Sequence, residues 1–219
     1  MIIPSPFAVV AEIRALLHTP DFWLIVGNSV VRVLFGIVFA LAVGGLGGIA
    51  SAFSPVFGRL TRPVIAVIQA TPVVSFIIIA LIWFQSDHVA IFISFLMCLP
   101  IVWNNVSTGI RAVDRDLVEM ARVFRVTRWE RFLRVYLPSI QPYLIAAMTT
   151  VLGLAWKVSV AAEVLSHPRY GIGTKLHGAK VYLDTPNLFA WTAIVVLLSM
   201  GFDHAFGWGI RRVAQRRKR

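Results

Sequence analysis

The sequence predicts an all-α, polytopic membrane protein with about five transmembrane helices and a two-helix loop that protrudes on one side. Hydrophobic residues make up 58% of the 219 residues and charged residues only 14%, whereas an ordinary soluble domain is about 25% charged. Several apolar segments reach the roughly 20 residues that a helix needs to cross a bilayer. Most basic residues lie between or after these segments. Lipid is therefore the predicted solvent for most of the chain.

Five apolar segments are long enough to span a membrane, and they cover residues 23–53, 63–84, 89–110, 139–165 and 188–210. The first exceeds the length that a bilayer requires, so its early part is expected to tilt or to lie outside the hydrocarbon. No polar low-complexity linker and no internal repeat is evident between them. The chain is therefore predicted to form a single membrane domain over residues 23–210.

Small residues recur at four-residue spacing along the first span, at Gly36, Ala40, Gly44 and Gly48. This spacing places them on one helical stripe, where another helix can approach closely. We expect the stripe to pack against a neighbouring span or a second subunit. In the second arrangement two copies bury the stripe and form a path between them.

The distribution of basic residues sets the expected orientation. One set of connections carries 15 basic residues, and the opposite set carries four. Lys and Arg accumulate on the cytoplasmic side of membrane proteins, so the richer set is predicted to be cytoplasmic and the amino terminus to lie outside. Residues 1–22, with an amphipathic stretch at 6–17, are expected on the outer membrane surface. Residues 211–219 form a basic tail that is expected inside.

Several classes of function are excluded by composition and spacing. The net charge of +11 does not indicate a nucleic-acid partner, because the basic residues flank membrane spans. The single cysteine, Cys98, offers neither a disulfide nor a metal quartet, and His167 and His177 have no carboxylate ligand pattern between them, so no metal is predicted. The chain has no G-x-x-x-x-G-K-[ST] phosphate cradle. It is therefore not expected to hydrolyse ATP itself.

The connection between the third and fourth spans, residues 112–138, is named here the cationic loop. Asp114 is placed to cap a helix over residues 115–124, and Thr127 with Glu130 forms a capping-box pattern that starts a second helix. Trp129, Phe132, Leu133 and Tyr136 then share one face. Pro138 is expected to end the second helix, because proline disfavours the α conformation in the residue before it. Arginines stand at every third position from 122 to 134.

The cationic loop is similar to the cytoplasmic "EAA" loop of the membrane subunits of binding-protein-dependent ABC importers. That motif reads Glu-Ala-Ala, three residues, Gly, nine residues, then Ile-x-Leu-Pro. Here the matching positions are Glu119-Met120-Ala121, Arg125 and Val135-Tyr136-Leu137-Pro138. Arginine at the glycine position indicates a bend that needs no positive φ or that is shifted along the chain. Met120 and Val135 are the other departures.

The resemblance covers nearly the whole chain and points to the nitrate/sulfonate/taurine branch of these permeases. The segments that carry it include "PSPFAVVAEIRALL", "LTRPVIAVIQATPVVSFIIIALIWF", "GIRAVDRDLVEMAR", "LGLAWKVSVAAEVL" and "YGIGTKLHGAKVYLDTPNLFAWTAIVVLL". One departure is large. That branch usually has another membrane helix before the Pro-Ser-Pro segment, and this chain starts almost there.

The resemblance implies the permease subunit of an ABC importer in the bacterial inner membrane, which moves a small solute inward. The implied substrate is an anion, such as a sulfonate or nitrate, or a vitamin precursor. The chain is then no enzyme and holds no cofactor, because ATP and Mg bind a separate ATPase subunit on the cytoplasmic side. Other implied partners are a second permease copy, an extracytoplasmic solute-binding protein and membrane lipid. An intramembrane enzyme and a secondary transporter remain the alternatives.

Two groups of residues are the candidate sites. The ATPase is expected to grip the cationic loop through Glu119, Ala121, Arg122, Arg125, Arg128, Trp129, Leu137 and Pro138. Polar or helix-breaking residues inside the spans are candidates for the substrate path, namely Gln69, Thr71, Pro72, Ser75, Asn104, Asn105 and Lys157. Pro72 is expected to kink the second span, and Lys157 is placed to attract an anion. The alternative for each polar group is a hydrogen bond between helices.

Two further charged residues fall inside the spans. Arg32, early in the first span, is expected either to snorkel to the membrane surface or to pair with another group. Glu163, in the fourth span, is expected near the outer edge, where it meets solvent or the binding protein.

Overall fold

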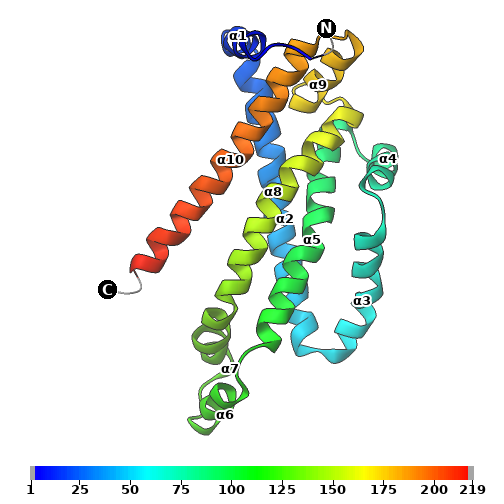
Figure 1. Cartoon of the computed structure of the whole chain (residues 1–219). Helices are drawn as coiled ribbons and strands as arrows, with labels where there is room; N and C mark the ends of the chain where they lie inside the picture. Colours follow the sequence, from blue (N-terminus) through cyan, green and yellow to red (C-terminus); the bar gives the residue numbers. More distant parts are fainter. Residues whose placement is uncertain (1–2, 217–219) are drawn as a thin grey trace.

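Four long helices stand side by side in the bundle (Figure 1), and they are α2 (Phe22–Phe53), α5 (Ser86–Arg111), α8 (Leu137–Ser166) and α10 (Thr185–Arg216). The computed structural model describes residues 3–216, with side chains through Gly209, and no strand occurs within this range. Four helical segments there are long and apolar enough to cross a membrane, and a bent pair adds a fifth if it counts as one span. The predicted all-α class and number of spans are thereby confirmed.

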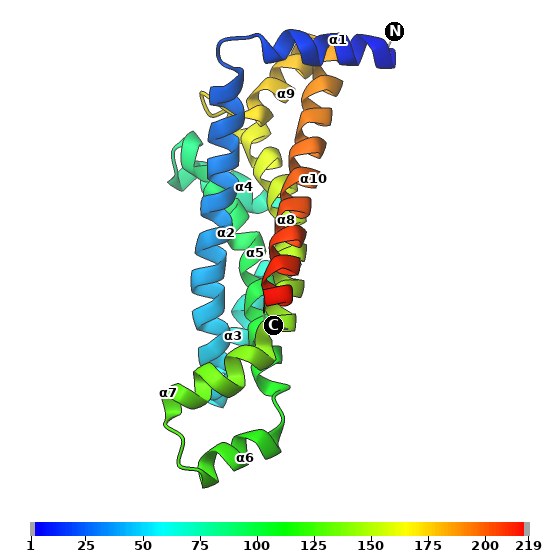
Figure 2. The ribbon, with the colours of Figure 1, turned by 90° about the vertical axis from the view of Figure 1, so that its left-hand side faces the viewer.

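The two ends of the bundle carry different elements (Figure 2). The short helices α1 (Pro6–Leu17) and α9 (Ile172–Val181) lie at one end, named here the α1 end, and α1 runs across the tops of the long helices. The cationic loop lies at the opposite end, named here the loop end. Helix α10 continues past the predicted boundary at Ile210 to Arg216, and the last tail residues, 217–219, lie outside the described range.

The stripe of small residues packs inside the chain, against α5. A Cβ added at Gly36 would overlap the side chain of Ser94, and one added at Gly48 would lie 2.8 Å from the carbonyl oxygen of Trp103. The two helix backbones therefore touch along this seam, as small residues allow. The expectation of a neighbouring span is confirmed. The expectation that two copies bury the stripe between them is wrong, because α5 already covers it.

The second predicted span, residues 63–84, is broken into two helices. They are α3 (Pro55–Ala70) and α4 (Val73–Trp83), and the chain bends by 102° between them. Thr71 is extended, with ψ 132°, because the residue before a proline avoids the helical region, and Pro72 then caps α4. The sequence predicted that Pro72 kinks a continuous span, but the span is instead broken into two helices at this proline. Helix α3 also begins earlier, where the Ser54 hydroxyl accepts a hydrogen bond from the Phe57 N–H at 3.3 Å.

A buried carboxylate ties three helices together at the α1 end. Glu163 of α8 is 0% exposed. Its side chain accepts hydrogen bonds from the Ser29 hydroxyl at 2.9 Å, from Arg32 Nη1 at 3.0 Å and from the Gly173 N–H at 3.0 Å. The prediction that Glu163 meets solvent or a binding protein is therefore wrong. Arg32 pairs rather than snorkels, which settles the alternative that the sequence left open.

Arg32 extends this cluster to two more segments. Its Nη2 lies 2.6 Å from Asp87 Oδ1 at the start of α5, and its Nη1 donates to the Tyr170 carbonyl at 2.6 Å. The Ser29 hydroxyl accepts from the Ile172 N–H at 3.0 Å. We name Ser29, Arg32, Asp87 and Glu163 the polar clamp. It joins α2, α5, α8 and the start of α9, and two of its charges, on Arg32 and Glu163, are buried, where a lone charge would be costly.

Replacing Glu163 with Gln is expected to lower the free energy of unfolding by on the order of 3 kcal/mol, because the buried Arg32 guanidinium loses its buried counter-charge. Thermal unfolding of the detergent-solubilised protein measures this. Asp87→Asn is the matched control, since the Asp87 side chain is 59% exposed and an exposed pair contributes less than about 1 kcal/mol. Equal losses in the two variants would contradict the role of Glu163 as the buried anchor.

Candidate functional site

Two short helices form the cationic loop, as predicted. Helix α6 (Arg115–Val123) is capped by the Asp114 side chain, which accepts from the Asp116 N–H at 2.9 Å. Helix α7 (Arg128–Arg131) starts with the predicted capping box, in which the Glu130 N–H donates to the Thr127 hydroxyl at 3.3 Å and the Thr127 N–H to Glu130 at 3.4 Å. Both helix starts are therefore fixed by local sequence.

The second helix of the loop does not end at Pro138, which corrects the prediction. A π-helical turn, η1 (Phe132–Tyr136), follows α7 directly and leads into α8. The Leu137 N–H reaches back to the Phe132 carbonyl, five residues away, and this wider turn makes room for a proline ring that would clash in a regular helix. Residues 128–166 thus form one continuous helical span. The loop is joined to the membrane bundle without a hinge at this point.

Arg125 lies at the bend between α6 and α7 with φ 53°. The bend therefore uses the left-handed conformation that glycine adopts freely. The prediction that arginine here means a bend without positive φ, or a shifted bend, is wrong. A non-glycine residue in this region carries a conformational cost of roughly 1–2 kcal/mol. The Val126 N–H, which donates to the Ala121 carbonyl at 3.0 Å, closes the turn.

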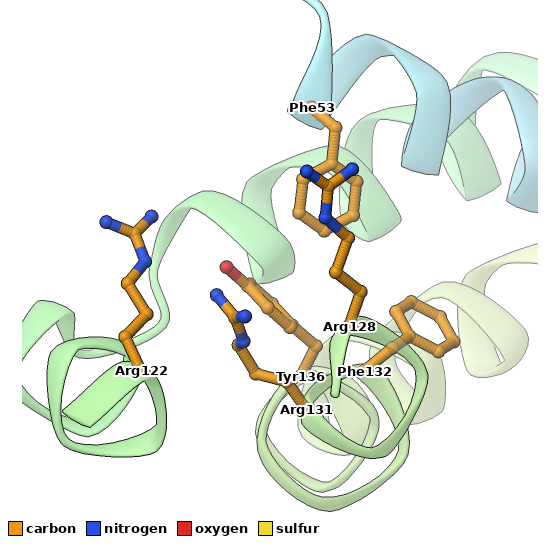
Figure 3. Close-up of a pocket in the computed structure, with 6 residues that line it drawn as sticks. All are labelled: Phe53, Arg122, Arg128, Arg131, Phe132 and Tyr136. Atoms are coloured by element: carbon orange, nitrogen blue, oxygen red, sulfur yellow. The ribbon is translucent and has the colours of Figure 1, made fainter. Parts of the chain in front are cut away.

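Three arginines converge on a cleft between the loop and the end of α2 (Figure 3). The cleft has a volume of about 650 Å³ and is lined by Phe53, Arg122, Arg128, Arg131, Phe132 and Tyr136. Arg128 reaches from α7 towards Phe53, Arg131 lies beside Tyr136, and Arg122 stands apart from them on α6. Among the side chains that the structure describes, ion pairs form only at Arg32. The arginines that line this cleft therefore form no ion pair with the described residues.

The other predicted loop residues differ in their surroundings. Trp129 is 68% exposed and Leu137 41% exposed, so both are available to a partner. Ala121 is buried, at 5%, and helps to close the loop on itself. Glu119 is exposed and lines a second, smaller cleft with Arg115, Arg122 and Tyr136. The loop therefore presents apolar and charged groups on one protruding element.

Only part of the predicted substrate path comes together. Gln69 of α3 and Asn104 of α5 line one polar cleft of about 330 Å³ at the loop half of the bundle. Asn105 instead donates to the Ile101 carbonyl of its own helix at 2.8 Å, and Thr71 donates to the Val67 carbonyl at 2.8 Å. Lys157 is exposed on α8, away from that cleft. Thr71 and Pro72 lie at the α3–α4 break, and Ser75 lies in α4 just beyond it.

Sequence reasoning missed the arginines of this cleft. Arg62 and Arg111 line it together with Gln69, Asn104 and Thr108. The signal was present, because residues 104, 108 and 111 on α5 and residues 62, 66 and 69 on α3 each follow the i, i+4, i+7 spacing of one helical face. Both arginines were assigned only to the charge balance of the connections.

The fold and the loop define a polytopic helical membrane protein with a protruding cationic element. Residues 36–219 match the model of the family described as "Binding-protein-dependent transport system inner membrane component". The chain therefore belongs to this family, and the family resemblance read from the sequence is confirmed.

Two curated relatives show how far the similarity extends. The nitrate import permease protein NrtB of Leptolyngbya laminosa is 31% identical over 146 residues, which cover 66% of this chain and 52% of the relative. The bicarbonate transport system permease protein CmpB of Synechococcus elongatus is 28% identical over 153 residues, 69% of this chain and 55% of the relative. The chain thus spans about half the length of these relatives.

Among solved structures, a chain of the MetNI methionine ABC transporter in an inward-facing conformation is similar in fold. The TM-score is 0.76 at 15% sequence identity, and the match covers 89% of this chain and 98% of that chain. At this identity the similarity establishes the fold alone.

Replacing Arg125 with Gly is expected to stabilise the loop by about 1 kcal/mol, because glycine adopts the positive φ without a Cβ penalty. Hydrogen exchange measured by mass spectrometry should show slower exchange over residues 119–128. Arg125→Ala removes the same charge but keeps the strain, so exchange there should not slow. Equal slowing in both variants would show that the arginine charge, and not the backbone, destabilises the bend.

Proposed function

We propose that the chain is the membrane subunit of an ATP-driven importer that carries a small anion into the cytoplasm. ATP hydrolysis takes place on a separate ATPase subunit, which docks on the cationic loop. Two copies of the chain line the path, and a solute-binding protein delivers the anion at the α1 end. Family membership supports the transporter class, and the geometry of the loop supports the docking site.

The observation that carries this proposal is the positive charge of the protruding loop, which forms no ion pair with the described residues. Arg122, Arg128 and Arg131 face a cleft without an acidic lining residue, and Trp129 stands exposed beside them. Arginine and tryptophan are enriched where protein interfaces carry most of their energy. The continuous helix over residues 128–166 gives a docked partner a direct connection to the bundle.

The proposed orientation places the loop end in the cytoplasm. Helices α2, α8 and α10 each have one end at the loop side of the bundle (Figure 1), and the chain's basic residues concentrate there, as the positive-inside rule requires. The amino-terminal helix α1, which lies across the opposite end, then rests on the outer surface of the membrane. Its polar and apolar residues suit that position.

The proposed anionic substrate has two supports. Relatives of this chain are named for nitrate import and for bicarbonate transport, and both of those solutes are anions. The chain itself carries basic or neutral polar groups at membrane depth, such as Lys157 in α8 and the cleft that contains Gln69 and Asn104. Charged groups inside membrane proteins commonly mark substrate pathways.

Reversing two loop charges tests the docking site. The double variant Arg122→Glu/Arg128→Glu, co-expressed with the ATPase subunit, should retain at least tenfold less ATPase on affinity purification, because acidic partner groups would then face acidic residues. Quantitative mass spectrometry of the purified complex gives the ratio of the two chains.

The matched control carries the same charge change at the other end of the bundle. Lys175→Glu/Lys180→Glu alters two basic residues of α9, both exposed, and should keep the full amount of ATPase. Loss of the ATPase in this control, or its retention in the loop variant, would contradict docking on the cationic loop.

A further inference from the structure

The polar cleft between α3 and α5, named here the α3–α5 cleft, is lined by basic and neutral groups without any carboxylate. Its lining residues are Ser51, Gly58, Thr61, Arg62, Ile65, Ala66, Gln69, Trp103, Asn104, Ser107, Thr108 and Arg111. Two guanidinium groups thus share one cavity of about 330 Å³. Both arginines are exposed in the isolated chain, and like charges that line one cleft repel each other. An anion bound between the two guanidinium groups would reduce their mutual repulsion.

The two arginines keep donors available for such an anion. Arg111 Nη2 donates to the Ser51 carbonyl at 3.0 Å, which fixes one arm of its guanidinium against the end of α2. Its remaining N–H groups make no hydrogen bond with the described part of the chain. Arg62 forms neither a hydrogen bond nor an ion pair with any residue in that part. Guanidinium groups bind oxyanions in a bidentate manner.

Three neutral side chains add free donors on the same walls. Gln69, Asn104 and Thr108 line the cleft, and their side chains make no hydrogen bond to the residues that the structure describes. Two other polar groups there are satisfied locally, because Thr61 donates to the Phe57 carbonyl at 2.8 Å and Ser107 to the Asn104 carbonyl at 3.2 Å. These three side chains are exposed, so their polar groups are available to a ligand in the cleft.

A small residue and an aromatic ring shape the cavity. A Cβ added at Gly58 would lie 3.0 Å from the Ser51 carbonyl oxygen and 3.4 Å from Arg111 Nη2, so glycine leaves room for the guanidinium at the mouth. Trp103 forms an apolar wall and stacks on Phe57, with ring centroids 6.0 Å apart. The cleft thus combines polar groups with an aromatic wall.

We propose that the α3–α5 cleft binds a small oxyanion, which Arg62 and Arg111 hold as charged ligands and Gln69, Asn104 and Thr108 hold as neutral donors. This inference rests on the proposed function and adds a specific anion-binding site in the loop half of the path. The oxyanion comes either from the transported solute or from the phosphate of a lipid headgroup, since both present the same chemistry to the arginines.

The experiment uses the complex of the chain with its ATPase in nanodiscs of phosphatidylcholine, titrated calorimetrically with nitrate, bicarbonate and ethanesulfonate. At least one anion should bind, and Arg62→Gln and Arg111→Gln should each weaken binding at least tenfold, as expected for a lost charged hydrogen bond. Arg62→Lys should keep part of the affinity. Arg59→Gln is the matched control, because Arg59 lies on the same helix but does not line the cleft.

A second arm identifies the source of the oxyanion. Nanodiscs that contain phosphatidylglycerol are examined by native mass spectrometry for lipid retained by the complex. Retention that depends on Arg62 and Arg111, without solute binding, supports the oxyanion site and assigns it to a headgroup. If neither the solutes nor the lipid depend on these arginines, the inference is overturned. If a variant fails to fold, the unaltered chain is treated with phenylglyoxal instead. Nitrate or phosphatidylglycerol must then protect Arg62, but not Arg59, from modification.

Failure of this inference can be distinguished from failure of the proposed function. If the Arg62→Gln complex retains its ATPase but binds anions as before, the importer assignment stands and the α3–α5 cleft is not the site. If the unaltered chain does not retain an ATPase at all, the proposed function fails regardless of the arginines.

Discussion

The buried pair of Arg32 and Glu163 is the interaction on which the arrangement of the helices depends. A carboxylate with no exposed surface must be paired, because an unpaired charge in the interior costs several kcal/mol. Its partners come from α2 and from the start of α9, and Arg32 adds the start of α5. The α1 end of the bundle is therefore fixed by polar contacts, whereas the rest of the α2–α5 seam is held by the close approach of small residues.

The same helix that carries Glu163 also carries the cationic loop. Residues 128–166 form one span, so a force on α7 reaches α8 without crossing a flexible connection, and α8 ends at the polar clamp. The second predicted span behaves differently, because a 102° bend separates α3 from α4. We therefore expect α3 and α4 to move more readily than α2, α5 and α8. The α3–α5 cleft lies between the bent α3–α4 pair and the continuous helix α5.

Sequence alone predicted four continuous spans and the starts of the loop helices, because apolar length and capping residues act locally, but it missed the break in the second span. The prediction failed where a tertiary contact or an uncommon turn determines the position or the conformation of a residue. Pro138 lies within a helix because the π-turn at residues 132–136 accommodates it, and Arg125 accepts a positive φ. Glu163 was assigned to the surface because its partner Arg32 is 131 positions away in the sequence, and no periodicity links the two.

The central claim, that the ATPase docks on the cationic loop, is tested most directly by asking which end of the bundle it touches. Val123 on α6 is 80% exposed and Tyr182 after α9 is 85% exposed, whereas the native Cys98 is fully buried. Val123→Cys and Tyr182→Cys are each labelled with a photoactivatable maleimide in the assembled complex. The account predicts an adduct between position 123 and the ATPase and none from position 182. Adducts from position 182 alone would contradict it.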